Sequence, residues 1–161
     1  MSRKILLIIS SVLVLIALNF AIFEKEQLKK KGDTVLLVLA PVDPRSLMQG
    51  DYMALRYEME RQTPLLNEDS SGGYLVLTLD QNKVGSFKRF YQDGETLAND
   101  EKLLRYRLKR SSIQIAPNAF FFQEGQGQLY QKARYGEFKV DESGNHLLVG
   151  LVDEHFKRIE P

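Results

Sequence analysis

One apolar run near the N-terminus constrains this chain more than any other feature. Ile5 to Phe23 is nineteen residues long and contains no charged side chain. As an α-helix, a run of this length extends roughly 28 Å at about 1.5 Å per residue, close to the hydrocarbon thickness of a bilayer. We therefore predict one membrane-spanning helix, with the lipid bilayer as its surroundings.

The end of this run indicates an uncleaved membrane anchor rather than a signal peptide that is removed. A signal peptide has a shorter apolar core, followed by a small-x-small cleavage site. Residues 19–23 read NFAIF, which does not fit such a site. The polar members Ser10, Ser11 and Asn19 can satisfy their hydrogen-bonding groups inside the helix or against a partner helix.

Charge is distributed unevenly around the run. Residues 1–31 hold six of the 22 Lys and Arg residues and two of the 21 Asp and Glu residues, so residues 32–161 carry a net charge of about −3. Basic residues gathered beside an apolar run fit lipid headgroups better than nucleic acid, and we expect no nucleic-acid partner. They flank the run on both sides, so counting Lys and Arg leaves the orientation open. Residues 24–31 favour helix and Gly32 favours its end, which makes residues 1–32 an anchor with a juxtamembrane helix.

Residues 33–161 are enough for a single hydrophobic core, and strand patterns dominate them. Residues 34–40 read as a buried strand, and the alternation over 52–59 as a half-buried one. Residues 74–79 with 84–90, and 136–140 with 146–152, flank turn sequences typical of hairpins. Further extended segments are expected at 103–108, 113–115 and 119–123, a loop over 60–72, and a short helix over 127–134. The prediction is a mainly β, mostly antiparallel, barrel- or sandwich-like domain with one or two short helices.

Three consecutive aromatic residues, Phe120, Phe121 and Phe122, lie in the extended segment at 119–123. Because side chains alternate along a strand, at least one of the three points away from the local core. An exposed phenylalanine would indicate a contact surface. Burial between layers of the domain is the more common explanation, and we favour it.

Several segments carry a resemblance to a known family. Residues 50–57 follow the pattern G-D-Y-x-x-L-x-Y, preceded by APVDPR at 40–45 and followed by FFQEG at 121–125, ARYGEF at 133–138 and L-x-G-L at 148–151. Together with the apolar anchor, these segments resemble the bacterial GDYXXLXY proteins over nearly the whole chain. Members of that family look like single-pass envelope proteins and are similar to products found beside polytopic membrane proteins. The resemblance therefore implies a polytopic membrane partner, an inner-membrane location and a domain outside the cytoplasm.

The motif residues have a structural reading and a functional one. In the structural reading, Asp43, Pro44, Gly50 and Asp51 form turns that Arg45 pins by pairing with an aspartate, and Leu55 and Tyr57 face the core. Tyr52 then falls on the opposite face. In the functional reading, the loop that carries these residues is a docking surface for a partner or ligand.

Enzyme readings have weaker support, and we lean against an enzyme. Residues 46–51 faintly resemble part of the signal-peptidase pattern, in which a serine nucleophile works with a lysine base, here Lys83 or Lys88. The nucleophile's position falls on Val42, and Ser46 occupies another slot of that pattern.

Other candidate groups for chemistry are few. Glu124 and Glu137 are a possible carboxylate pair, and Arg134 is a further weak candidate. The absence of cysteine excludes thiolate chemistry. Two histidines, His146 and His155, make a weak metal site even with Asp153 and Glu154 beside the second.

We thus expect no catalytic residue, metal or cofactor. The leading hypothesis is a non-enzymatic, membrane-anchored accessory protein that binds or regulates a polytopic integral membrane protein. An envelope hydrolase or small-ligand-binding domain is the alternative.

Overall fold

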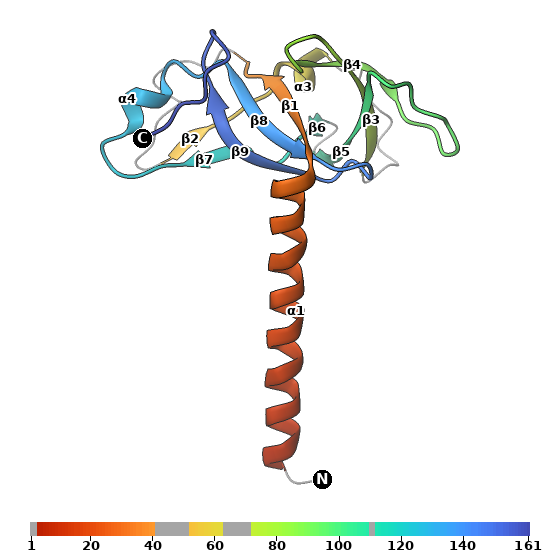
Figure 1. The fold of residues 1–161 in the computed structure, drawn as a ribbon, viewed down its shortest axis with the longest axis vertical. Coiled ribbons are helices and arrows are strands. Elements are labelled where there is room, and N and C mark those ends of the chain that lie inside the picture. Colours follow the sequence, from red (N-terminus) through yellow and green to blue (C-terminus); the bar gives the residue numbers. More distant parts are fainter. Residues whose placement is uncertain (1–2, 41–51, 63–71, 110–111) are drawn as a thin grey trace.

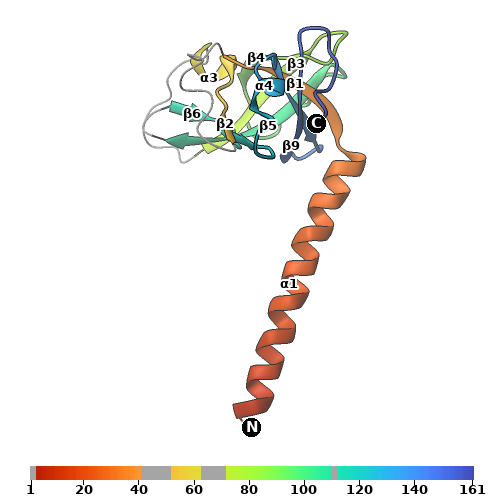
Figure 2. The same ribbon diagram turned by 90° about the vertical axis from the view of Figure 1, so that its left-hand side faces the viewer.

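A single long helix carries a β-rich domain. The computed structural model describes residues 3–40, 52–62, 72–109 and 112–161. Helix α1 (Arg3–Lys31) projects from one side of the domain as an isolated rod (Figures 1 and 2). From Leu7 to Lys31 it is long and apolar enough to cross a membrane, and its most apolar stretch is not buried inside the protein.

The domain is built mostly from antiparallel strands. Its strands are β1 (Asp33–Val38), β2 (Tyr52–Ala54), β3 (Gly72–Leu79), β4 (Gly85–Phe90), β5 (Glu101–Lys109), β6 (Ser112–Gln114), β7 (Ala119–Phe121), β8 (Tyr135–Val140) and β9 (His146–Val152). The short helices are α3 (Glu58–Gln62) and α4 (Gly127–Tyr130). One sheet has the order β1-β8-β9, a second β4-β3-β5-β6, and β2 pairs with β7. Every neighbouring pair in these sheets is antiparallel.

The two larger sheets adjoin through an isolated bridge between Leu36 and Val84. There the Leu36 N–H donates to the Lys83 carbonyl over 2.9 Å. The combined surface curls like half of a barrel (Figure 1). The predicted fold class, mainly β with an N-terminal apolar helix and a few short helices, is therefore confirmed.

One hydrophobic core fills the curl. It draws side chains from both larger sheets, from the β2–β7 ribbon and from α3 and α4. The largest completely buried side chains include Tyr57, Phe138, Leu37, Leu75, Leu104 and Ile115. Gly85 lies where the sheets meet, and a Cβ there would come within 3.1–3.3 Å of Leu77, Val35 and Leu37. The close approach of the two sheets thus requires a residue without a side chain at this position.

Both predicted hairpins are present, and one mechanism closes both turns. In the β3–β4 turn the Asp80 carboxylate accepts the N–H groups of Asn82 and Val84 over 2.8 Å. In the β8–β9 turn the Asp141 carboxylate accepts those of Ser143 and Asn145 over 2.9 Å. An aspartate that bonds to the backbone just ahead of it is a local feature, which is why the sequence pattern located both turns.

The strand expected over residues 52–59 is wrong beyond its first residues. Strand β2 ends at Ala54, and α3 begins at Glu58 inside the expected strand and ends at Gln62 inside the expected 60–72 loop. The Glu60 carboxylate accepts the N–H of Ile115 over 2.6 Å and the N–H of Tyr57 over 3.3 Å. The bond to Ile115 comes from a distant segment, which a local alternation pattern cannot predict.

The helix expected over 127–134 is also shorter than predicted, since α4 ends at Tyr130. The Ala133 N–H still donates to the Tyr130 carbonyl in a turn, but the Arg134 N–H donates to the Val152 carbonyl over 2.8 Å. Pairing with the end of β9 therefore ends the helical stretch early.

Candidate functional site

The junction between α1 and the domain contains no flexible linker. Only Gly32 separates α1 from β1, and its N–H donates to the Leu28 carbonyl over 2.9 Å. Leu28 is only 8% exposed because it packs against the domain. A Cβ on Gly32 would lie 2.6 Å from the Leu28 carbonyl oxygen and 3.1 Å from the Lys139 Cβ. This close approach requires glycine, and it fixes the direction of α1 relative to the sheets.

An open groove of about 850 Å³ lies beside this junction. One wall is the face of α1 that carries Phe20, Phe23, Glu24, Lys25, Gln27, Leu28 and Lys31, and the other contains Asp33 and the residues Val140, Asp141, Glu142, Ser143 and Asn145 of the β8–β9 turn. We call it the juxtamembrane groove. Its lower end is apolar, and charges of both signs surround its upper part.

The turn that forms one wall of the groove is held firmly. Gly144 has φ +79°, a conformation that favours glycine, and its carbonyl accepts the Arg105 N–H of β5 over 2.9 Å. A Cβ at Gly144 would lie 3.0 Å from the Tyr74 ring. The wall is thus tied to the second sheet and not only to its own hairpin.

His146 directly follows this turn, and its ring lies close to backbone carbonyl groups. Its Nε2 lies 2.8 Å from the Ala116 carbonyl oxygen, and its Nδ1 lies 3.3 Å from the Gly144 carbonyl oxygen. The ring meets Phe138 edge-on, with 5.5 Å between centroids. Burial lowers the pKa of His146, and the ring joins the turn to the segment that contains Ala116.

The described motif residues separate into two groups. Leu55 and Tyr57 are buried in the core, as predicted. The Tyr57 hydroxyl donates to the Pro117 carbonyl over 2.8 Å, and burial raises the pKa of this hydroxyl. Tyr52 lies across from Phe121 in the β2–β7 ribbon, and their ring centroids are 5.8 Å apart. Asp43, Pro44, Arg45, Gly50 and Asp51, together with Val42 and Ser46, lie outside the described residues.

Two segments that carry the resemblance meet at Tyr57. Its ring contacts Phe138 edge-on at 5.4 Å. A Cβ on Gly136 would lie 3.2 Å from both of these rings. The Tyr of residues 50–57 and the Gly and Phe of residues 133–138 thus form one packing unit, which gives the spacing of both segments a structural role.

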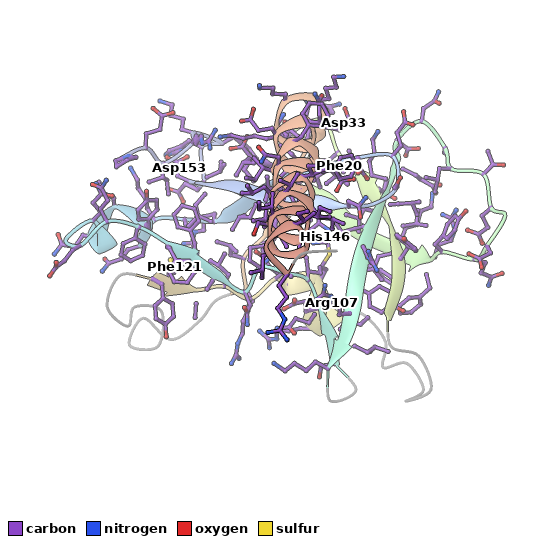
Figure 3. All side chains as sticks on the ribbon, turned by 90° about the horizontal axis from the view of Figure 1, so that it is seen from below. Phe20, Asp33, Arg107, Phe121, His146 and Asp153 are labelled. Carbon is purple, nitrogen blue, oxygen red and sulfur yellow. The ribbon has the colours of Figure 1, made fainter. Side chains whose placement is uncertain are left out.

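Phe121 is the exposed member of the aromatic run. Phe120 and Phe122 pack on Tyr130, with ring centroids 5.1 and 5.2 Å apart, whereas Phe121 is 75% exposed. Seen along α1 from below, Phe121 lies well to one side of the helix (Figure 3). The alternation predicted from the sequence is confirmed, but the favoured expectation that the run is buried between layers is wrong for Phe121.

The weaker candidates Glu124, Glu137 and Arg134 lie in different environments. Glu124 is exposed in the loop between β7 and α4. Glu137 is mostly buried on β8 and lies 3.6 Å from the Arg158 Nε. Arg158 reaches it across Gly150, where a Cβ would be only 2.7 Å from that nitrogen. The Arg134 side chain is exposed, and its backbone joins the sheet.

A buried ion cluster escaped the sequence reasoning. Glu101, whose side chain is 4% exposed, accepts hydrogen bonds from Arg89 over 2.6 Å and pairs with Lys88 at 2.8 Å. The bonds from Arg89 and then Lys88 lower the pKa of Glu101 to about 2. Lys88, one of the two lysines considered as a base, is therefore a partner of this carboxylate in the folded domain. Lys88 and Arg89 lie on β4 and Glu101 begins β5, and no local sequence pattern connects these residues.

Among the residues that the structure describes, no three His, Asp or Glu side chains gather as a metal site. His155 is exposed and lies 3.7 Å from the neighbouring Glu154. The Asp153 carboxylate instead accepts the N–H groups of His155 and Lys157 over 2.9 Å, which closes a turn.

The fold and this site define a class: a curled β domain joined without a linker to one long apolar helix. The model of the family described as GDYXXLXY protein matches residues 14–151, and the chain belongs to that family. Comparisons with curated proteins and with solved structures gave no match.

Proposed function

We propose that this protein is a non-enzymatic accessory protein of the bacterial inner membrane, anchored by α1, whose domain outside the cytoplasm binds a polytopic membrane protein. The observation that carries the proposal is the exposure of α1. Thirteen of its large apolar side chains, between Ile5 and Phe23, are exposed. Burying each is worth roughly 1.5–3 kcal/mol. The summed cost of leaving these side chains in water exceeds the roughly 5–15 kcal/mol of free energy that stabilises a folded domain. Helix α1 therefore needs an apolar environment.

The junction supports a role at the membrane surface. Because Gly32 joins α1 to β1 directly, an inserted α1 would hold the domain at one height and in one orientation. Lys29, Lys30 and Lys31 then lie in the last turn of α1, near the headgroups, where they also interact favourably with the helix dipole. A domain on a flexible tether would not present one fixed face to a membrane partner.

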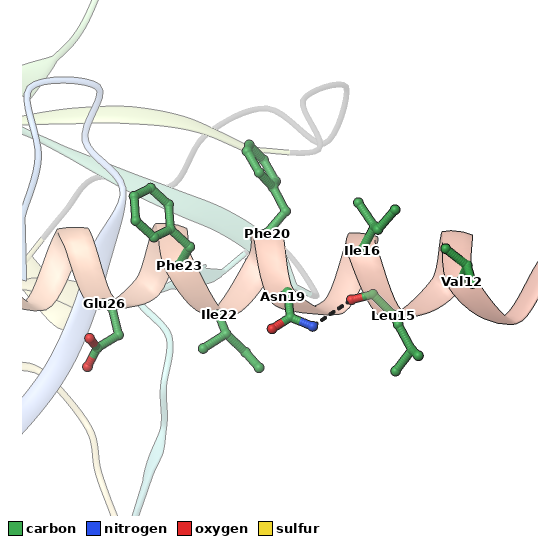
Figure 4. Close-up of a pocket in the computed structure, with 8 residues that line it drawn as sticks. All are labelled: Val12, Leu15, Ile16, Asn19, Phe20, Ile22, Phe23 and Glu26. Atoms are coloured by element: carbon green, nitrogen blue, oxygen red, sulfur yellow. Dashed lines mark hydrogen bonds between the residues drawn. The ribbon is translucent and has the colours of Figure 1, made fainter.

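One face of α1 suits a partner helix. Val12, Ile16 and Asn19 recur at steps of four and three residues, the spacing of a helix–helix seam. The Asn19 amide donates to the Leu15 carbonyl over 2.8 Å (Figure 4), so its side-chain oxygen can accept a bond from a neighbouring helix. Ser10 and Ser11 both donate to the Leu7 carbonyl within the helix.

Phe121 supports a second contact, made by the domain itself. A phenylalanine that is 75% exposed beside a ribbon carrying Tyr52 is unusual for a surface that meets only water. We assign Phe121 to the partner interface, so that α1 and the domain both contact the same membrane protein.

The test is purification of the full-length, tagged protein from native membranes in mild detergent, followed by mass spectrometry. We expect retention in membranes after a carbonate wash and one polytopic protein in near-stoichiometric amount. Phe121→Ser and Asn19→Leu should each lower partner recovery at least fivefold. Phe156→Ser is the matched control, because Phe156 is also exposed, at 42%, but stacks on Tyr135.

Release of the protein by the carbonate wash would contradict the proposal that α1 anchors it in the membrane. Retention in the membrane without a polytopic partner would overturn the accessory role while leaving the anchor in place. Equal loss of partner in the Phe156 variant would show that Phe121 is not a specific contact.

A further inference from the structure

The juxtamembrane groove lies at the depth of lipid headgroups when α1 spans the membrane, so a ligand site in the groove rests on the proposed anchor. With Phe23 at the edge of the hydrocarbon, Lys25 lies about 3 Å and Lys31 about 12 Å further along the helix axis. The headgroup region is roughly 5–8 Å thick on each side of a bilayer. The flexible lysine side chains on α1 therefore bracket the level of the lipid phosphate.

The groove presents unpaired charges of opposite sign on facing walls. Lys25 and Lys31 line the α1 wall, and within the described chain neither makes an ion pair. Asp141 and Glu142 line the wall formed by the β8–β9 turn. Among the described residues, Asp141 accepts hydrogen bonds from the neutral groups of Ser143 and Asn145 and forms no ion pair. Glu142 is exposed at the tip of the turn.

The lower end of the groove is apolar. Phe20 and Phe23 project from the same side of α1, away from Ile22 and Leu15 (Figure 4). Both line the groove together with Leu28, which is buried against the domain. An acyl chain placed there would continue from the headgroup level into the hydrocarbon along α1.

We infer that the juxtamembrane groove binds one phospholipid whose headgroup carries both a phosphate and a primary amine, as in phosphatidylethanolamine. The phosphate pairs with Lys25 and Lys31, the ammonium donates to Glu142 and Asp141, and an acyl chain packs on Phe20 and Phe23. The walls are firm before binding, because Gly32 fixes α1 and the Gly144 carbonyl accepts the Arg105 N–H. Preorganisation of this kind lowers the cost of binding.

The charge pattern discriminates between lipid classes. A choline headgroup carries the same charge as an ethanolamine headgroup but has no N–H to donate to the carboxylates. A glycerol headgroup lacks the cation, so its lipid would bring only net negative charge beside Glu142 and Asp141. Selection therefore depends on the acidic wall, and retention of any phospholipid depends on the lysine wall.

The experiment uses full-length protein in nanodiscs that contain phosphatidylethanolamine, phosphatidylcholine and phosphatidylglycerol in equal amounts, followed by native mass spectrometry of the released protein. We expect one retained phosphatidylethanolamine per chain, favoured about tenfold over phosphatidylcholine. Glu142→Gln should reduce this preference several-fold. Lys25→Gln should lower retention of all three lipids.

Two control variants carry the same chemical changes outside the groove. Lys30→Gln lies next to Lys31 on α1 but outside the groove, where Lys30 pairs with Glu26 at 2.9 Å. Glu154→Gln removes an exposed carboxylate beside His155. Both should leave the lipid preference unchanged, and near-UV circular dichroism should verify that all four variants keep the fold.

The outcomes separate the site from the anchor. Equal retention of phosphatidylethanolamine and phosphatidylcholine would overturn recognition of the amine. Insertion into nanodiscs without any retained lipid would overturn the site and leave the anchor intact. A chain that does not enter nanodiscs at all would overturn the anchor, and the lipid site with it.

Discussion

Helix α1 and the β domain use the same apolar residues in opposite ways. Leu15 in α1 is 58% exposed, whereas Leu37 in β1 is completely buried. Helix α1 is apolar all round and satisfies its backbone internally, which suits a hydrocarbon environment. The domain alternates apolar with polar residues and turns its apolar face inward. The comparison teaches that the periodicity of apolar residues, more than their number, decides where each side chain ends up.

The two regions should also differ in what holds them together. The domain depends on close packing between segments that are distant in sequence, such as Tyr57 with Gly136 and Phe138. Helix α1 depends on its own hydrogen bonds and meets β8 and β9 through its C-terminal part, where Leu28 is buried. Three predictions test this contrast, in order of decreasing effect.

The largest effect is expected in the core. Tyr57→Ala should destabilise the domain by roughly 3–5 kcal/mol, because it leaves a cavity and removes the bond to the Pro117 carbonyl. Tyr57→Phe should cost only about 1 kcal/mol. Chemical denaturation of the full-length protein in detergent, followed by near-UV circular dichroism, measures both. Ile16→Ala in α1 is the control and should leave this transition unchanged, and a comparable loss in that variant would contradict the contrast.

The second effect concerns buried and exposed ion pairs. The pKa of Glu101 is lowered to about 2 in the folded domain from an ordinary value near 4.5. A lowered folded pKa stabilises the folded state above pH 4.5, and this contribution is lost as the pH falls from about 4.5 towards 2. Glu101→Gln should therefore lower the melting temperature at pH 7, on the order of 5 °C.

The same variant should flatten the fall in melting temperature between pH 5 and pH 3, measured by thermal scans of the full-length protein. Glu26→Gln is the matched control, because Glu26 is 54% exposed in its pair with Lys30 on α1. An exposed pair contributes little, so this change should not move the melting temperature of the domain. A pH profile that is the same in the Glu101 variant and the parent would exclude the buried cluster as its source.

The smallest effect is expected at the junction of the two regions. Gly32→Ala places a Cβ 2.6 Å from the Leu28 carbonyl, so the last turn of α1 must shift. The shift is confined to the last turn of α1, so the direction of α1 should become less uniform while the domain keeps its fold. The chain has no cysteine, so spin labels on Glu26→Cys and Glu154→Cys report one distance.

Electron–electron double resonance should give a narrow distance distribution in the parent and a broader one in Gly32→Ala. Lys31→Ala, one residue earlier, should keep the narrow distribution. A broad distribution already present in the parent would mean that the junction is flexible, and the fixed height of the domain would no longer hold.

The sequence alone determined the features that depend on neighbouring residues. The apolar run gave α1, and the alternation of side chains placed Leu55 and Tyr57 in the core. Asp80 and Asp141 marked both hairpin turns, because each carboxylate bonds to the backbone two and four residues ahead. The strand patterns were enough for the mainly β fold class, and the segments around residues 50–57 for the family.

Only the tertiary structure decided the features that join distant segments. Helix α3 replaces the end of an expected strand because Glu60 accepts the Ile115 N–H, a bond that spans 55 residues. Glu101 meets Arg89 and Lys88 only once β4 and β5 flank β3 in the sheet. The juxtamembrane groove likewise exists because residue 32 and residues 140–145 are brought together by sheet pairing. Local patterns report a residue's own preferences, whereas these contacts depend on which partner the whole fold places beside it.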